Sequence, residues 1–153
     1  MKAKGGFSTH VELRPAMLKH PADIEISLKD GKVQIGRAHA VYGVPKRVAS
    51  WLRSVHADGL SERISGEDRS PVGILEYVEV DQDYRGQGLG RRLVEELLGV
   101  LDQKGVQVVY LQASADVGGI PERALVRLYE EFGFKEIGRT GDHADDPVMI
   151  LEL

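Results

Sequence analysis

The sequence predicts an α/β (α+β) domain, built on a mixed, mostly antiparallel and twisted sheet of six to seven strands with flanking helices. Two patterns indicate this class: the first third of the chain alternates apolar and polar residues, and strand-like and helix-like segments alternate after residue 70. The 153 residues fit a single domain, residues 1–153, and are too few for two ordinary domains. A composition of 42% hydrophobic and 29% charged residues is typical of a globular protein.

Three strands are expected in the first third of the chain. A short alternating run that Pro15 ends predicts the first strand. The dipeptide Asp30-Gly31 separates two further alternating runs, which is the pattern of a β-hairpin. The expected strands cover residues 8–14, 23–29 and 32–41.

Residues 44–70 interrupt this pattern and are interpreted as a helix-plus-loop insertion. Pro45 suits the first position of a helix, and Val48, Trp51, Leu52 and Val55 follow the spacing of one helical face. The stretch 57–71 is polar and rich in turn-forming residues, so it is expected to be an exposed loop.

The remainder of the chain alternates strands and helices. Leucines recur every four residues over 88–103, which predicts an amphipathic helix. A second helix over 121–132 begins at Pro121 and ends before Gly133. The expected strands around these helices cover residues 72–80, 106–112, 134–139 and 148–153.

Composition excludes several classes of function. The chain has no cysteine, which excludes disulfides, thiolate zinc sites and a cysteine nucleophile. A net charge of −4 and a pI of about 5.7 argue against binding nucleic acid through bulk charge. There is no apolar run of membrane-spanning length and no signal-like start, so we expect a cytoplasmic protein without a membrane partner.

One segment carries a chemical signal, the glycine turn Arg85-Gly86-Gln87-Gly88-Leu89-Gly90 between a strand and a helix. Glycines allow the backbone to approach a ligand closely, and the first amides of a helix are unpaired and partly positive. Arg91 and Arg92 follow within the first helical turn, where a bound polyanion would offset their unfavourable interaction with the helix dipole. The turn therefore predicts a phosphate site, unless the glycines serve a tight turn alone and the arginines reach solvent.

The same residues resemble a known family, the GNAT acyltransferases, which transfer acetyl groups from acetyl-CoA to amines. The glycine turn matches the family pattern Q/R-x-x-G-x-G/A, and residues 124–134, ALVRLYEEFGF, are similar to its A-x-x-x-L-Y-x-x-x-G-F helix and strand. The resemblance covers about residues 24–42 and 72–153 and implies the GNAT fold and acetyl-CoA as co-substrate. The cofactor-binding residues that it implies are Val78, Glu79, Val80, Arg85, Gly86, Gln87, Gly88, Leu89, Gly90 and Arg91.

Two residues are the candidates for catalysis, Tyr129 and Glu76. The resemblance implies that Tyr129 points at the CoA sulfur and protonates the departing thiolate; the alternative is a core tyrosine. A protonated amine has a pKa of about 10.4, so attack also needs a base. Regular alternation would place Glu76 in an otherwise apolar row of side chains on the strand before the glycine turn, where a partly desolvated carboxylate suits a base. The alternative is a glutamate that is ion-paired or hydrated. That row is Ile74, Glu76, Val78 and Val80.

Histidines offer alternative bases and a weak metal signal. His39 and His56 each end an expected element, so either could be an alternative base, although a surface or structural role is the plainer account of each. The cluster of His143 with Asp142, Asp145 and Asp146 reads as a charged hairpin tip, so no metal site is predicted.

The acceptor is expected to be an amine of a small molecule or a protein. The helices that usually help to bind acceptors in the resembled family have no room before the second strand, so residues 44–70 are the candidate replacement. A spacer or a contact in a homodimer is the alternative role for this stretch. A non-catalytic CoA-binding regulator on the same fold is the alternative function. The side chains expected to stay free for an acceptor or a second subunit are Arg53, His56, Glu62, Arg63, Glu67 and Asp68.

Overall fold

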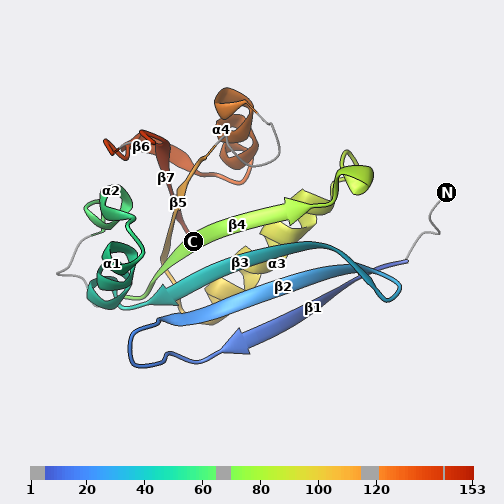
Figure 1. The fold of residues 1–153 in the computed structure, drawn as a ribbon, viewed down its shortest axis with the longest axis horizontal. Helices are drawn as coiled ribbons and strands as arrows, with labels where there is room; N and C mark the ends of the chain where they lie inside the picture. The colour runs from blue at the N-terminus through green and yellow to red at the C-terminus, as the bar shows by residue number, and fades with distance from the viewer. Residues whose placement is uncertain (1–5, 65–69, 115–120, 143) are drawn as a thin grey trace.

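A seven-stranded sheet organises the molecule in the computed structural model, which describes residues 6–64, 70–114, 121–142 and 144–153 (Figure 1). Its strand order is β1-β2-β3-β4-β5-β7-β6, with β4 and β5 parallel and the other neighbouring pairs antiparallel. The strands are β1 (Phe7–Arg14), β2 (Ala22–Asp30), β3 (Val33–Gly43), β4 (Val72–Val80), β5 (Val108–Gln112), β6 (Lys135–Arg139) and β7 (Pro147–Glu152). The helices are α1 (Pro45–Ser54), α2 (Asp58–Ser61), α3 (Leu89–Gln103) and α4 (Glu122–Glu130), with a 3-10 turn η1 (Gln82–Tyr84). The predicted fold class is confirmed.

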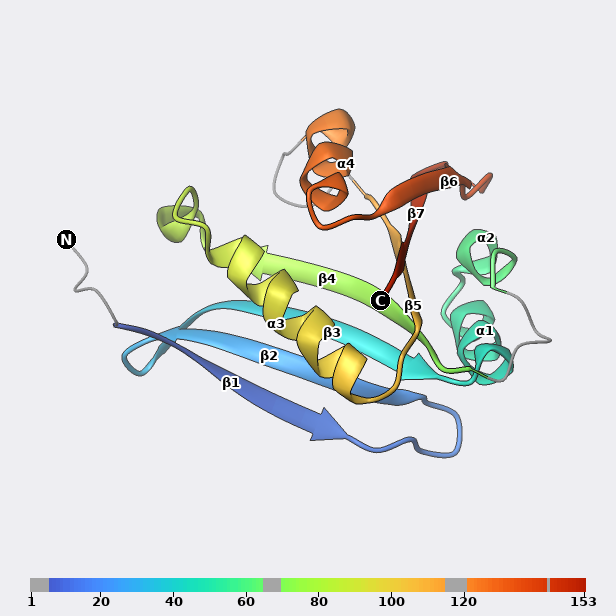
Figure 2. The ribbon, with the colours of Figure 1, turned by 180° about the vertical axis from the view of Figure 1, so that it is seen from behind.

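The larger apolar core lies between α3 and one face of strands β2, β3 and β4. Figure 2 shows α3 lying across these strands from behind. The leucine row of α3 meets alternate side chains of the strands, because both faces carry the apolar spacing that the sequence shows. The fully buried residues of this core include Ile24, Ile26, Leu28, Leu93, Leu97 and Leu101. None of the helices among the described residues is long and apolar enough to cross a membrane.

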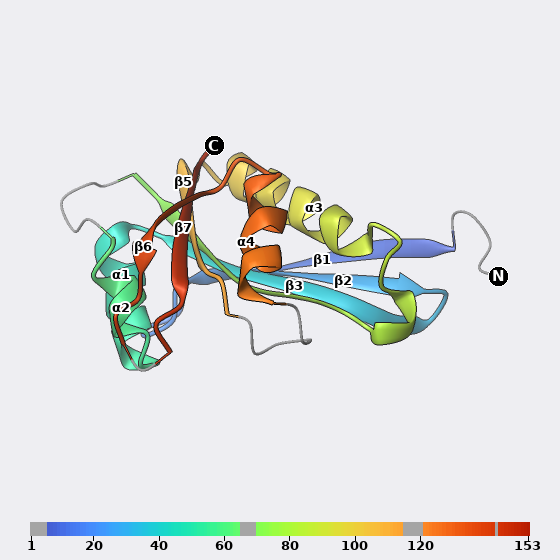
Figure 3. The same ribbon diagram turned by 90° about the horizontal axis from the view of Figure 1, so that it is seen from above.

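A second apolar core holds α1 and α2 against the opposite face of the sheet. Trp51 and Leu52 of α1 pack with Ile74 of β4 and Tyr110 of β5. These helices lie near the start of β4, whereas η1 and the glycine turn lie at its far end (Figure 3). The insertion is thus packed onto the sheet rather than appended to it.

The expectation of an exposed loop at 57–71 is wrong for its first part. Residues 58–61 form α2, and Leu60 and Ile64 are buried in the second core at the four-residue spacing of a helical face. Arg63 donates hydrogen bonds to the carbonyls of Ile137 and Arg139 on β6, and Arg53 donates to Ser61. These two arginines, expected to be free, therefore fasten the insertion; Glu67 and Asp68 lie outside the described residues.

Strand β4 changes character at Glu76. Leu75 pairs with Ala40 and Tyr77 pairs with His39, so Glu76 is the extra residue of a β-bulge. The bulge interrupts the alternation of side chains, with the result that Ile74 packs in the second core and Val78 and Val80 pack against the first. The prediction that Ile74, Glu76, Val78 and Val80 share one face is therefore wrong.

The two central strands also separate at this point. β4 pairs with β5 over residues 72–75 and 108–111, after which β4 continues to Val80 and β5 ends at Gln112. Figure 1 shows the two strands diverging, with β7 following β5 away from β4. An opening between the strands follows directly from this register.

Candidate active site

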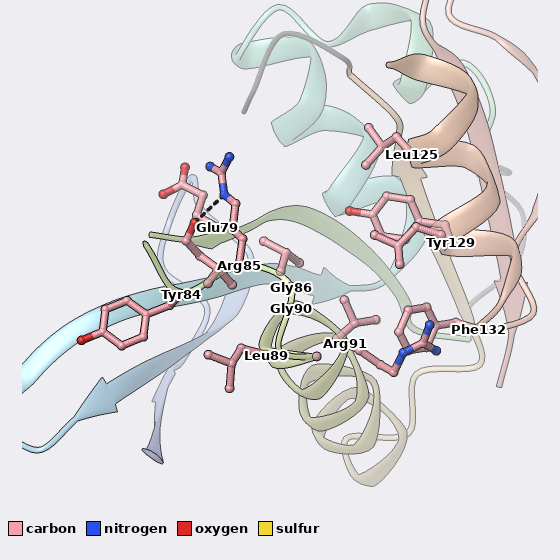
Figure 4. Close-up of a pocket in the computed structure, with 15 residues that line it drawn as sticks. Glu79, Tyr84, Arg85, Gly86, Leu89, Gly90, Arg91, Leu125, Tyr129 and Phe132 are labelled. Atoms are coloured by element: carbon pink, nitrogen blue, oxygen red, sulfur yellow. Dashed lines mark hydrogen bonds between the residues drawn. The ribbon is translucent and has the colours of Figure 1, made fainter. Parts of the chain in front are cut away.

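A cavity of about 480 Å³ occupies the opening beyond the last β4–β5 pair, between β4, the glycine turn, the start of α3 and α4 (Figure 4). It brings Tyr129 together with every predicted cofactor-binding residue except Gln87. Gln87 is exposed, and its amide donates to the Tyr84 carbonyl at 3.4 Å. Lining residues that the sequence analysis did not assign to the site are Tyr84, Val94, Leu125, Leu128 and Phe132.

The glycine turn has the geometry of a backbone cradle. Gly86 and Gly88 have φ values of 81° and 77°, which side chains other than glycine adopt at a cost. A Cβ atom added to either glycine would meet no protein atom within 4 Å, so the space beside the backbone is open. Gly88 caps α3 without a side-chain hydrogen bond, and the first turn of the helix has no acidic residue. The amides at the start of α3 are therefore suited to an anion.

The arginines near this turn are more tightly held than expected. Arg91 forms an ion pair with Glu131 and stacks over the ring of Phe132 at 5.3 Å, linking α3 to α4. Arg92 Nε lies 3.6 Å from Glu96 Oε1, one turn along the same helix. Arg85 Nε donates to the Val80 carbonyl at 3.0 Å. Acidic partners thus offset part of the positive charge that the sequence places against the helix dipole.

Tyr129 reaches into the cavity from α4, and its hydroxyl points toward β4 in Figure 4. The residue is 8% exposed, and its ring packs edge-on against Phe134 at 5.8 Å. Burial raises the pKa of Tyr129 to about 12. Its hydroxyl is therefore protonated throughout the physiological pH range and can act as a hydrogen-bond donor.

Glu76 does not line this cavity. It lines a second one of about 200 Å³, on the face of the sheet that carries α1 and α2. Residues 74–76 of β4 border the second cavity and residues 78–80 border the first, so a single strand connects them. The wall of the second cavity is mainly apolar, with Glu76, Gln112 and Ser114 as its polar members; the apolar members are Trp51, Leu52, Val55, Ala57, Leu60, Ile74 and Leu75.

Glu76 contacts a buried histidine. His39 Nδ1 lies 2.7 Å from Glu76 Oε1, and its Nε2 lies 2.7 Å from Asp23 Oδ2. Arg14 Nη2 lies 3.0 Å from the same oxygen of Asp23. The sequence analysis had His39 as one alternative base and missed Asp23 and Arg14. The hairpin signal at Asp30-Gly31 could have placed Asp23 and His39 on neighbouring strands, which is the signal for their contact.

The other histidines considered in the sequence are His56 and His143, which lies among aspartates. His56 is exposed after the end of α1 and lines neither cavity. His143 lies outside the described residues. Asp142 accepts hydrogen bonds from Thr140 and from the backbone of Ala144 and Asp145, as expected of a turn.

A family model described as the acetyltransferase (GNAT) family matches residues 35–134. The chain belongs to this family. The match contains both motifs on which the resemblance rested, and the predicted acyltransferase class agrees with it. The cavity described above lies largely within the matched region, at the place where the two motifs meet.

Curated relatives match parts of this GNAT chain. The [ribosomal protein bS18]-alanine N-acetyltransferase of Escherichia coli K12 is 41% identical over 59 residues, or 39% of this chain. The mycothiol acetyltransferase of Nocardiopsis dassonvillei is 38% identical over 84 residues, or 55% of this chain. The matched segments span 36% and 22% of the length of these two relatives.

Solved structures of low sequence identity share the fold. Arabidopsis thaliana NAA60 in complex with acetyl-CoA has a TM-score of 0.63 at 17% identity, covering 86% of this chain and 76% of that one. Arabidopsis thaliana Naa50 in complex with a bisubstrate analogue has a TM-score of 0.58 at 13% identity, covering 84% and 72%. These likenesses confirm the GNAT fold of the chain.

Proposed function

We propose that this GNAT chain transfers an acetyl group from acetyl-CoA to a primary amine by direct attack. The observation that carries the proposal is the cavity at the divergence of β4 and β5, which joins the glycine turn to Tyr129. The second cavity approaches the same strand from the other face and holds the carboxylate of Glu76. Two ligands could thus reach β4 from two sides, as a transfer between two substrates requires.

The residues of the larger cavity fit CoA. The open backbone at Gly86 and Gly88, with the uncapped start of α3, suits a pyrophosphate, and Arg85 and Arg91 lie beside it. Beyond Leu75, no described strand pairs with the β5-facing edge of β4, which leaves backbone groups for the amides of a pantetheine arm. Acetyl-CoA supplies a thioester, whose acetyl carbon accepts the amine.

Tyr129 is proposed to donate a hydrogen bond to the departing thiolate. A hydroxyl with a pKa of about 12 is a weaker acid than a thiol, for which about 8.5 is typical, so complete proton transfer is unfavourable. The hydrogen bond alone stabilises the charge that develops on sulfur, in a cavity whose lining is mainly apolar. This refines the predicted role of an acid.

Glu76 is proposed to accept the proton of the amine. Its side chain is 30% exposed, and the bulge places it at the point where the two strands separate. A carboxylate there attracts an ammonium group and removes the proton that blocks nucleophilic attack. Gln112 and Ser114, at and after the end of β5, are the other polar residues that an acceptor in this cavity could contact.

The insertion is proposed to recognise the acceptor, because α1 and α2 form the apolar wall of the second cavity. The acceptor that suits this wall is an amine carried on a compact group with an apolar side, rather than a polycation. A peptide N-terminus belongs to this chemical class, and one relative is named for the N-acetylation of a ribosomal protein's alanine. A cytoplasmic location remains a prediction, as does the alternative role of residues 44–70 in a homodimer.

The decisive experiment measures release of free thiol from acetyl-CoA in the presence of a panel of amines. The panel contains peptides with small and large apolar N-terminal residues, lysine-type amines and polyamines. Thiol release that depends on a peptide or another apolar amine supports the proposal. CoA binding without release for any amine would favour the alternative, a CoA-binding regulator. Absence of CoA binding at low salt contradicts both functions.

A further inference from the structure

A chain of four charged or titratable side chains crosses the face of the sheet opposite α3. It runs from Arg14 on β1 through Asp23 on β2 and His39 on β3 to Glu76 in the bulge of β4. Asp23 is 5% exposed and His39 is 8% exposed, whereas Glu76 borders the second cavity. The chain therefore has a buried interior and one end at the proposed acceptor site.

His39 lies between two carboxylates, so its contacts depend on whether its ring carries one proton or two. Both ring nitrogens lie 2.7 Å from a carboxylate oxygen. Nε2 is hydrogen-bonded to Asp23, whereas Nδ1 is in contact with Glu76 but is not aligned for a hydrogen bond, so it is a buried polar atom without a hydrogen-bond partner. A neutral imidazole has one N–H group, so it can donate to Asp23 or to Glu76 but not to both. An imidazolium carries a proton on Nδ1 as well, and a small rotation of the Glu76 carboxylate would align its oxygen with that proton. Gain of one proton by His39 therefore allows it to donate to both carboxylates.

We infer that Asp23, His39 and Glu76 act as one proton-holding unit, in which Glu76 takes the proton of the acceptor ammonium and His39 stores it. The inference rests on the proposed acetyl transfer. His39 is a positioning residue, since it acts through Glu76, and Asp23 with Arg14 holds its ring in place.

The acceptor ammonium gives one proton to Glu76, which passes it to Nδ1 of neutral His39 and returns to the carboxylate form. The freed amine forms the N–C bond to the acetyl group while the C–S bond breaks, and its second proton leaves with the thiol. His39 then releases the stored proton to solvent through Glu76, the exposed end of the unit.

The charges around His39 favour proton storage. Burial lowers the pKa of His39, but the neighbouring carboxylates of Glu76 and Asp23 raise it by a larger amount. The net pKa therefore lies above its ordinary value. Tyr77 stacks on the ring at 5.4 Å and is neutral, because burial raises the pKa of Tyr77 to about 12. Glu25 and Arg37, on the same face of the sheet, engage the hydroxyl and the ring of Tyr77, and Glu25 Oε2 also lies 3.9 Å from Arg14 Nη2.

Two measurements test the unit. Histidine NMR of the protein, with His39 assigned through His39→Gln, gives its pKa without any need for activity. The pH dependence of kcat/KM, with one acceptor for all variants, reports the proton acceptor in catalysis. We expect Asp23→Asn to lower the pKa of His39 by about one unit and to move the rising limb of kcat/KM to lower pH by the same amount. Glu25→Gln, which removes a nearby carboxylate bonded to Tyr77, should move neither by a comparable amount.

Each outcome is decisive. A His39 pKa below 6.5, or equal shifts from Asp23→Asn and Glu25→Gln, overturns the unit even if acetyl transfer is observed. A raised pKa with a kcat/KM profile that Asp23→Asn does not move overturns its part in catalysis. If no amine is acetylated while His39 shows the expected pKa changes, the proposed transferase function is the part that fails.

Discussion

The two cavities beside β4 are built in different ways. The larger one takes most of its wall from two continuous segments, residues 78–94 and 125–132. The smaller one collects residues from α1, α2, β4 and the end of β5, which are scattered from 51 to 114. A contiguous motif carries its own geometry, whereas a scattered wall depends on the register of distant strands. The contrast explains why the sequence indicates a cofactor but leaves the acceptor open. Three experiments separate the two cavities, and a fourth tests the buried histidine beside the smaller one.

The largest effect is expected at the glycine turn. Gly88→Ala should weaken CoA binding by about tenfold or more, because the added methyl group occupies the open side of a backbone that also has a φ of 77°. Gly105→Ala is the matched control, with a φ of 81°, open space and a position outside the cavity. Calorimetry should show the loss for Gly88→Ala alone. Equal affinities for the two variants would mean that Gly88 serves the turn and not the ligand.

The next effect concerns the leaving group. Tyr129→Phe should lower kcat by about 10–100-fold and leave CoA affinity nearly unchanged, since it removes a hydrogen bond to a developing charge and little volume. Because the pKa of Tyr129 is about 12, the wild-type kcat should show no titration of this group below pH 10. Steady-state kinetics at saturating acetyl-CoA measures both. An unchanged kcat would make Tyr129 a packing residue.

A smaller effect should be specific to the second cavity. Val55 is 49% exposed and lines that cavity, so Val55→Ser should raise the KM of an apolar acceptor by about threefold to tenfold without changing CoA affinity. Val33→Ser is the control, because Val33 is 63% exposed and lines neither cavity. Shortening residues 57–70 would remove buried Leu60 and Ile64, so substitution is the cleaner test. Equal KM values would leave the insertion as a spacer.

The smallest effect is the pH dependence of stability. A raised folded-state pKa means that the protonated form of His39 stabilises the native state at pH values below about 6.5, and that this contribution is lost as pH rises through the raised pKa. The stability difference between wild type and His39→Gln should therefore shrink from pH 6 to pH 9. Urea denaturation across this range measures it, and a difference that grows with pH contradicts the assignment. Asp23 affects stability in the acidic range. Burial raises its pKa, but Arg14 and His39 lower it by a larger amount, so ionised Asp23 stabilises the folded state. This stabilisation is lost as the pH falls through the lowered pKa.

The sequence predicted the strands, the three longer helices and most of the larger cavity, because each rests on a local signal such as periodicity or a glycine turn. It failed where contacts are distant. The α2 segment was taken as loop, since Leu60 and Ile64 reveal their burial only against Trp51 and Ile74. Arg91 was predicted to bind the cofactor or to reach solvent, and its ion pair was missed because its partner Glu131 lies 40 residues away.

Strand β4 is the most instructive error. Regular alternation was assumed over 72–80, but the apolar residues Leu75, Val78 and Val80 are separated by three and then two positions. The odd interval is the signature of an extra residue, and it could have been recognised in the sequence. It would have put Glu76 on the face of His39 and not in an apolar row.

Glu76, the extra residue of the bulge, is not needed for pairing between β3 and β4, although it is the proposed base. Without Glu76, the run Ile74-Leu75-Tyr77-Val78-Glu79-Val80 alternates regularly, so β3 could pair with it throughout and the core side chains would keep their places. The residue proposed to deprotonate the acceptor is thus an added unit in an otherwise complete ladder. On the proposed assignment, we expect deletion of Glu76 to leave a protein that folds and binds CoA but does not transfer acetyl groups, so that one codon would separate an enzyme from a CoA-binding regulator on the same fold.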